Sequence, residues 1–205
     1  MPHWVRKVFP DATLRMSCVP RDTVDGRRRT RAMAGTLVGT HSALLGRGVS
    51  QEQVPTPPAL HGYLTHVRLS APGAPAARHC LSIYLPPEAT GGRRLKVLGA
   101  MRSHLASSLT AHPNDWFLVG GDFNGVTAAA DRSSGALTAA DARLVALLEE
   151  FRLVSVFSRC TDPRPHSHFS TGSSARLDDF LCKHDDPLLA ALALGPQTAG
   201  PDVAG

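Results

Sequence analysis

The chain has 205 residues, of which 42% are hydrophobic and 19% charged, a composition typical of one globular domain. Its four cysteines form no C-x-x-C pair, which argues against a zinc knuckle or a thioredoxin-type redox site. No run approaches the roughly 20 apolar residues that cross a membrane, and the first residues lack a secretory apolar region, so we expect a soluble intracellular protein. The net charge of +5 favours phosphate-bearing partners, although the arginine cluster at 27–31 is more typical of a solvated loop.

Three segments differ in pattern along the chain. Residues 1–31 lack a sustained period and are expected to be irregular, with one short strand around Ala12 to Cys18. Residues 32–194 carry the periodic apolar patterns of a folded domain. The tail 195–205, rich in Gly and Pro, is expected to be disordered.

The first half of the domain predicts three strands and a helix. Apolar, β-branched or alternating residues favour strands at 32–45, 60–69 and 79–85, and Pro86 ends the third because proline cannot donate to a sheet. From Leu95 onward an apolar stripe at helical spacing predicts a helix, with its charged residues largely off the stripe. The stripe is Leu98, Met101, Leu105 and Leu109, and the residues placed off it are Arg94, Lys96, Arg102 and His104.

A continuous apolar run, residues 116–119, ends at Gly120 and Gly121 and predicts a strand covered on both faces, as in layered α/β folds. Thr138, followed three residues later by Asp141, resembles a capping box and predicts the start of a second helix. Two further strands are expected at 154–157 and 176–182.

Polar residues follow the buried strand in the run GGDFNG, residues 120–125. Residues two apart in an extended segment share a face, so Asp122 and Asn124 should point together into a cleft while Phe123 turns into the core. The flanking glycines would admit a phosphate or a metal ion. An Asp that activates water and an Asn that donates to a phosphate oxygen suit phosphodiester hydrolysis. The alternative is a simple strand-end turn, which the same residue types favour.

Several motifs in this order resemble the endonuclease/exonuclease/phosphatase family, which includes DNase I-like enzymes. LVGGDFNG (118–125) is similar to the family's strand-end GDFN signature, and SIYLPP (82–87) to its N-x-Y-x-P strand, with Ser82 in place of the Asn. HSHFS (166–170) is similar to a segment usually read as T-F, and SARLDDFL (174–181) to its S-R-I-D-x-I-L strand. The resemblance covers residues 32–183 and looks most like a retrotransposon-type endonuclease domain.

The resemblance implies an α/β fold of the α+β kind, a DNase I-like four-layer sandwich of two packed, mostly antiparallel sheets flanked by helices, here incomplete. It implies a site lined by Tyr84, Asp122, Asn124 and Asp178, with Asp178 rather than Asp179 entering the cleft because adjacent strand residues face opposite sides. It also implies a Mg²⁺ or Mn²⁺ cofactor and DNA as partner, with RNA or a small phosphoester as alternatives, and a nuclear place of action for a retroelement enzyme.

The chain also departs from the family pattern. The Glu that holds the metal is not found upstream, Gln51 and Glu52 fall on the wrong side of the order, and no Ser-Asp-His follows Asp178. We therefore expect weak metal binding at Asp122 and little or no activity. The alternative is a degenerate, non-catalytic fragment or a nucleic-acid-binding remnant of a retroelement. His166 and His168 could share a metal, but one exposed and one hydrogen-bonded histidine is the favoured interpretation.

Overall fold

The structure is a computed structural model that describes residues 12–18, 23–24, 27–28, 35–87, 92–159, 168–170 and 173–189. The described strands are β1 (Ala12–Cys18), β2 (Thr23–Val24), β3 (Arg27–Arg28), β4 (Gly35–His41), β5 (Ser50–Gln53), β6 (Leu64–Ser70), β7 (Arg78–Tyr84), β8 (Trp116–Asp122), β9 (Leu153–Ser155), β10 (His168–Ser170), β11 (Ser173–Ala175) and β12 (Asp178–Lys183). The described helices are α2 (Ser42–Gly46), α3 (Gly92–Ala111), α4 (Ala139–Glu150) and the short 3₁₀ turns η1 (Pro58–Leu60), η3 (Ala129–Asp131) and η4 (Val156–Arg159).

Six strands form the central sheet, in the order β5-β6-β7-β8-β12-β9. Only β7 and β8 run parallel, joined through α3, and the other four pairings are antiparallel. The predicted mixed α/β fold with a mostly antiparallel sheet is therefore confirmed. Three two-stranded pairs, β1-β4, β2-β3 and β10-β11, complete the described strands.

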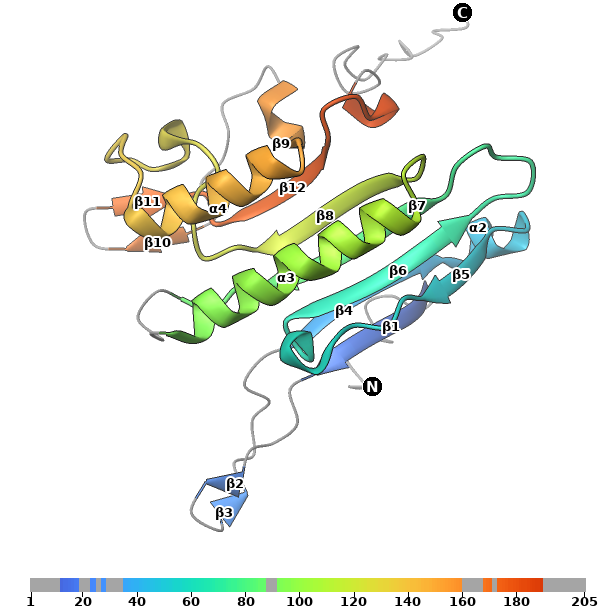
Figure 1. Ribbon diagram of the computed structural model, residues 1–205, viewed down its shortest axis with the longest axis horizontal. Coiled ribbons are helices and arrows are strands. Elements are labelled where there is room, and N and C mark those ends of the chain that lie inside the picture. Colours follow the sequence, from blue (N-terminus) through green and yellow to red (C-terminus); the bar gives the residue numbers. More distant parts are fainter. Residues whose placement is uncertain are drawn as a thin grey trace, which may run out of the picture.

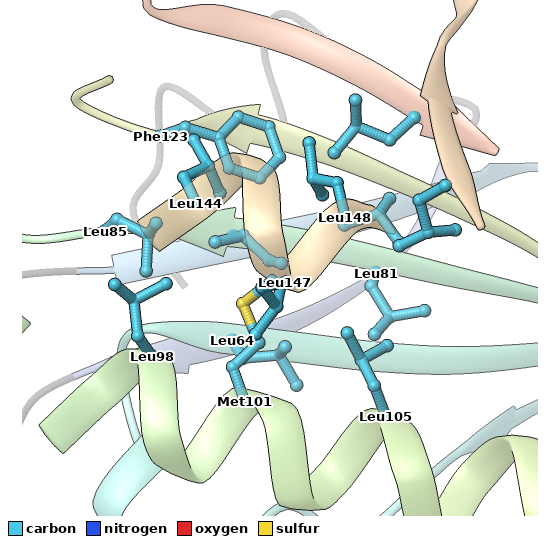
Figure 2. Packing of buried hydrophobic residues seen from close by; sticks show 14 of the residues in the cluster. Leu64, Leu81, Leu85, Leu98, Met101, Leu105, Phe123, Leu144, Leu147 and Leu148 are labelled. Carbon is cyan, nitrogen blue, oxygen red and sulfur yellow. The ribbon is translucent and has the colours of Figure 1, made fainter. Parts of the chain in front are cut away.

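Helices α3 and α4 cover one face of this sheet (Figure 1). The predicted stripe of α3 is confirmed, because Leu98, Met101 and Leu105 are buried there. Figure 2 shows these side chains meeting the leucines of α4 and Phe123 over the sheet. Because each fully buried large apolar side chain contributes about 1.5–3 kcal/mol, this layer is the main apolar source of stability among the described residues.

The pair β1-β4 lies against the opposite face of the sheet, over β6 and β7. Thr36 of β4 and Thr65 of β6 join the two through a hydroxyl pair 2.8 Å apart, and Thr65 also donates to the carbonyl of Thr36 at 3.0 Å. Helices, central sheet and β1-β4 thus give three layers, in agreement with an incomplete four-layer sandwich. The predicted boundary at residue 31 separates two strands, β1 and β4, that pair along their whole length.

Several sequence-based boundaries are wrong. The predicted strand at 32–45 ends at His41, because the His41 ring nitrogen accepts from the Ala43 N–H at 3.1 Å and starts α2. The predicted strand at 154–157 turns into η4 after Ser155. The run at 116–119 continues as a strand to Asp122, and β5, which is largely polar and exposed at the sheet edge, was not predicted.

Two polar residues of α3 were also assigned wrongly. Arg94 and His104 were placed off the apolar stripe, yet the structure buries them to 3% and 9% exposure. Arg94 donates to the carbonyls of Pro86 and Phe123, both at 2.9 Å, and His104 lies 2.8 Å from the ring of His66. Burial is tolerated because each group has polar partners there.

Some predictions fall outside the described residues, namely His166 and the tail 195–205. In the part of the chain that the structure describes, none of the helices combines the length and the apolar character needed to cross a lipid bilayer.

Candidate active site at the end of strand β8

The pairing of three neighbouring strands brings Tyr84, Asp122 and Asp178 into one row. Tyr84 of β7 is the register partner of Asp122 of β8, and Asp178 of β12 is its partner on the other side. Register partners share a face of the sheet, so the phenol and both carboxylates project to the same side. Asp122 is half-buried and Asp178 exposed, whereas Asp179 is buried, as the strand alternation predicts.

Asn124 contacts Asp122 directly. Its backbone N–H donates to Asp122 Oδ1 at 2.8 Å, and its side-chain amide donates to Asp122 Oδ2 at 3.2 Å and to the Leu85 carbonyl at 2.7 Å. The backbone at Asn124 is left-handed, with φ of 43°, rather than extended. Both amide hydrogens are engaged within the chain, so in this arrangement Asn124 holds Asp122. The prediction that Phe123 turns into the core is confirmed by its 0% exposure.

The glycines beside Asp122 let neighbouring parts of the protein pack closely against this loop. A Cβ at Gly121, where φ is 145°, would lie 1.9 Å from the carbonyl oxygen of Ile83, and one at Gly125 would lie 2.9 Å from the Arg94 guanidinium. The expectation that the flanking glycines admit a ligand is therefore corrected for these two positions. They allow β7 and α3 to approach the strand end closely.

A buried cation fixes the loop behind the row. Arg176 contacts Asp131 at 2.8 Å and Asp179 at 2.7 Å, and its side chain is 3% exposed. Asp179 also accepts from the hydroxyls of Thr127 at 2.8 Å and Ser155 at 2.9 Å. Because all these groups are paired, the network joins β12 to the loop that follows Asn124 and sets the position of Asp178.

Asp141 connects α4 to the same loop. The predicted capping box with Thr138 is confirmed, and Asp141 also accepts from the Val126 N–H at 2.9 Å and from Arg132 at 2.8 Å. Burial alone would raise the pKa of Asp141, but the hydrogen bonds from Thr138, Val126 and Arg132 outweigh it and lower the pKa below its usual value. The carboxylate is therefore ionised and serves as a structural acceptor.

Aromatic and apolar groups border the row on the β1-β4 side. The rings of Tyr63 and Tyr84 stack with centroids 6.4 Å apart. A hollow of about 370 Å³ lies between β4 and the sheet, lined by Leu37, Ser82 and Phe180 among others. Phe180, whose side chain is 51% exposed, is two residues beyond Asp178 on the same face of β12. The surface beside the row is thus apolar as well as acidic.

Gln51 and Glu52 lie away from this row. They belong to β5, three strands from β8, where Glu52 pairs with Arg68, Arg68 with His79 and His79 with Phe117. Phe117 is the second residue of β8 and Asp122 is the last, so the register places Glu52 toward the opposite end of the sheet from Asp122. This geometry agrees with the sequence interpretation that Glu52 does not replace the missing metal ligand.

The donors in the row suit a hard divalent cation. Asp122 and Asp178 offer carboxylate oxygens, and Mg²⁺ typically binds one or two carboxylates while keeping water and substrate oxygens. Opposed carboxylates also repel each other across a strand pair, which favours a cation between them. The residues present therefore fit Mg²⁺ or Mn²⁺.

The sequence matches no protein-family model, and no curated protein matches it. Solved structures do match. The endonuclease domain of TRAS1, a telomere-specific non-LTR retrotransposon, aligns over 84% of this chain and 68% of its own length, with 14% identity and a TM-score of 0.52. The AP endonuclease LMAP from Leishmania major aligns over 85% and 62%, with 16% identity and a TM-score of 0.62. A humanized Danio rerio TDP2 with 14 mutations aligns over 88% and 64%, with 12% identity and a TM-score of 0.54.

These likenesses establish the fold, which is the DNase I-like α/β sandwich. This chain spans about two thirds of the length of each matched structure.

Proposed function

We propose that this chain is a phosphodiesterase-type domain that acts on nucleic acid, with Tyr84, Asp122 and Asp178 at the scissile phosphate. The observation that carries the proposal is the row of these three residues at adjacent strand ends of a DNase I-like fold. Two of the matched structures are named as endonucleases, which supports this class of reaction. The net charge of +5 supports an anionic polymer, DNA first and RNA second, as the substrate.

Each residue has a role that its position supports. Asp122 orients or deprotonates the attacking water, and Asn124 keeps the carboxylate in place through the contacts at 2.8 and 3.2 Å. Tyr84 directs its hydroxyl to a phosphate oxygen. Asp122 and Asp178 would hold the divalent cation, which when bound neutralises charge that develops on the phosphate.

The experiment is a plasmid-nicking assay with purified protein, Mg²⁺ and supercoiled DNA, run in parallel with abasic-site DNA. The matched variants are Asp122→Ala and Glu149→Gln, since Glu149 is an exposed carboxylate on α4 away from the row. We expect slow nicking by the wild type and by Glu149→Gln, because the metal-binding Glu of the family pattern is missing, and loss of this nicking in Asp122→Ala. Equal traces from all three proteins would overturn the assignment of Asp122.

A second candidate is a nucleic-acid-binding domain without catalysis. It is favoured by the remoteness of Glu52 from Asp122, because this leaves the row without the expected metal-binding Glu in the part of the chain that is described. Salt-sensitive DNA binding without any nicking, unchanged in Asp122→Ala, would support this candidate over the enzyme.

A further inference from the structure

A second cluster of ligand groups lies at the opposite end of β8. His79 of β7, His112 just after α3 and Asp115 just before β8 present one nitrogen or oxygen each, and these atoms all lie within 4.8 Å of one another. His79 Nε2 is 3.1 Å and His112 Nδ1 3.7 Å from Asp115 Oδ2. Ligand atoms around a tetrahedral Zn²⁺ at 2.0–2.1 Å are about 3.3 Å apart, so a small inward shift of His112 completes three corners of such a site.

The cluster is separate from the row at Asp122. The strand β8 has seven residues, which puts its two ends about 20 Å apart. Its donors also differ in kind, because two imidazoles and one carboxylate suit Zn²⁺ and similar first-row ions, while Mg²⁺ prefers oxygen alone.

Two further histidines continue the cluster into the core. His66 Nε2 is 2.7 Å from His79 Nδ1, and His66 Nδ1 is 2.8 Å from His104 Nε2. Both His66 and His79 are 0% exposed. A metal-ligating histidine typically passes its second ring N–H to a fixed acceptor, and His66 occupies that position for His79.

In the absence of a metal, the hydrogen bonds of His79, His66 and His104 determine which ring nitrogen of each carries the proton. Asp115 can only accept, so His79 carries its proton on Nε2. Its Nδ1 must then accept from His66 Nε2–H, and His66 Nδ1 from His104 Nε2–H. A cation on His79 Nε2 requires the lone pair there, so the protons of His79, His66 and His104 all move from Nε2 to Nδ1. The number of protons is unchanged. The two hydrogen bonds between the imidazoles survive with their direction reversed, and the cation replaces the bond from His79 Nε2–H to Asp115.

The charges around the cluster agree with metal binding. Burial lowers the pKa of His79 and His104, and burial together with the neighbouring imidazoles lowers the pKa of His66 to about 3, so all three stay neutral at pH 7. Burial opposes ionisation of Asp115, but the Ala77 N–H, Arg68 and His79 outweigh it and lower its pKa.

Two side chains lie at the edge of the cluster. One opens it to solvent, and the other is a cation that competes with a metal ion for Asp115. His112 is 40% exposed in its side chain and opens the cluster to solvent, which leaves a corner for water. Arg68, whose Nε donates to Asp115 Oδ2 at 3.1 Å, is the cation that holds this oxygen in the absence of a metal. Asp115 Oδ1 is fixed separately by the Ala77 N–H at 2.9 Å, so Oδ2 alone has to change partner.

We propose that His79, His112 and Asp115 form a binding site for one divalent ion of the Zn²⁺ class, supported from behind by His66 and His104.

The first test is titration of the tag-free, chelator-treated full chain with Zn²⁺, in competition with a coloured chelator. We expect one Zn²⁺ ion to bind per chain, with His112 and Asp115 among its ligands. His112→Gln should weaken binding at least about tenfold, while the matched control His184→Gln, at an exposed histidine elsewhere, should not. Arg68→Gln should tighten binding about twofold to fivefold because the competing cation is removed.

The second test reads the tautomers by histidine ¹H–¹⁵N NMR. Zn²⁺ should move the ring protons of His79 and His66 from Nε2 to Nδ1. Tautomers that do not change at saturating Zn²⁺, binding by His112→Gln equal to the wild type, or the absence of stoichiometric binding would each overturn the site and leave the histidine chain as a purely structural hydrogen-bond network.

Discussion

The two ends of strand β8 carry opposite kinds of polar group. At its C-terminal end the half-buried Asp122 and the exposed Asp178 lie beside a phenol, and Asn124 holds the Asp122 carboxylate. At its N-terminal end Asp115 lies among buried imidazoles that reach through β7 and β6 to α3. One strand thus separates the proposed site for Mg²⁺ and a phosphate group from the proposed site for an ion of the Zn²⁺ class. Because the two ends are about 20 Å apart and differ in their donor groups, we expect cation binding at one end to be independent of cation binding at the other.

Asp122→Asn should produce the largest difference between the two ends of β8. We expect Mg²⁺-dependent nicking to fall about 10³-fold, because Asn cannot take a proton from water or neutralise a cation. Zn²⁺ binding at the other end should be unchanged. Parallel nicking and Zn²⁺ titrations check both statements, and a joint loss would mean that the two ends are one functional unit.

Arg176→Met tests the rigidity of the Asp122 end. The substitution leaves Asp131 and Asp179 buried without their cation, and we expect the free energy of unfolding to drop by about 3–5 kcal/mol. Urea denaturation gives the value. Arg102→Met is the control, since the Arg102 and Glu150 pair is exposed and screened by solvent, so its loss should change the stability little. Equal losses in both variants would contradict a special role for the buried network.

His104→Leu tests the histidine end in the same way. The variant removes the donor to His66 Nδ1 and should cost about 1–3 kcal/mol of stability. His104→Gln keeps an amide donor and should recover part of the loss. If both variants unfold at the same urea concentration as the wild type, the chain of imidazoles contributes nothing to the fold.

Thr138→Ala removes the cap of α4, whose Asp141 supports the loop after Asn124. We expect a loss of about 1 kcal/mol in urea denaturation, recovered by Thr138→Ser. Nicking should fall less than in Asp122→Asn, because the loop keeps its contacts with Arg176.

The smallest effect concerns pH at the Asp122 end. The folded-state pKa of Asp141 is depressed, so its contribution to stability is fully present above the unfolded pKa of about 3.9 and is lost as the pH falls through the folded value. Asp141→Asn should flatten this acid dependence in urea titrations between neutral and acidic pH. A wild-type acid profile that matches the variant would show that Asp141 titrates alike in both states.

The sequence predicted the elements that carry strong apolar or capping patterns. The runs before Pro86 and Gly120, the stripe of α3 and the box at Thr138 each have a local physical cause, so a short window of residues suffices. The sequence also led us to expect Tyr84, Asp122 and Asp178 at one site, through the family resemblance of the three segments that carry them, and the strand register brings them together.

The rest depended on contacts between distant segments. The strand β5 has no apolar signal because it forms a polar edge, and Arg94 appears exposed by spacing until the carbonyls of Pro86 and Phe123 satisfy it. The histidines at 66, 79 and 104 stand singly in three elements, and nothing in their spacing shows that the sheet and α3 bring them together. The available signal was limited to His66 and His79, which share a strand face with Leu64 and Leu81, because spacing placed His104 off the apolar stripe of its helix.

The positions of the two ends along the sequence also affect the order in which they are synthesised. Every member of the histidine end lies between residues 66 and 115, whereas the Asp122 end is complete only with Asp178. Domains emerge from the ribosome N-terminus first, at about 5–20 residues per second. The nascent chain can therefore assemble its histidine end several seconds before the residues that complete its acidic row have been translated.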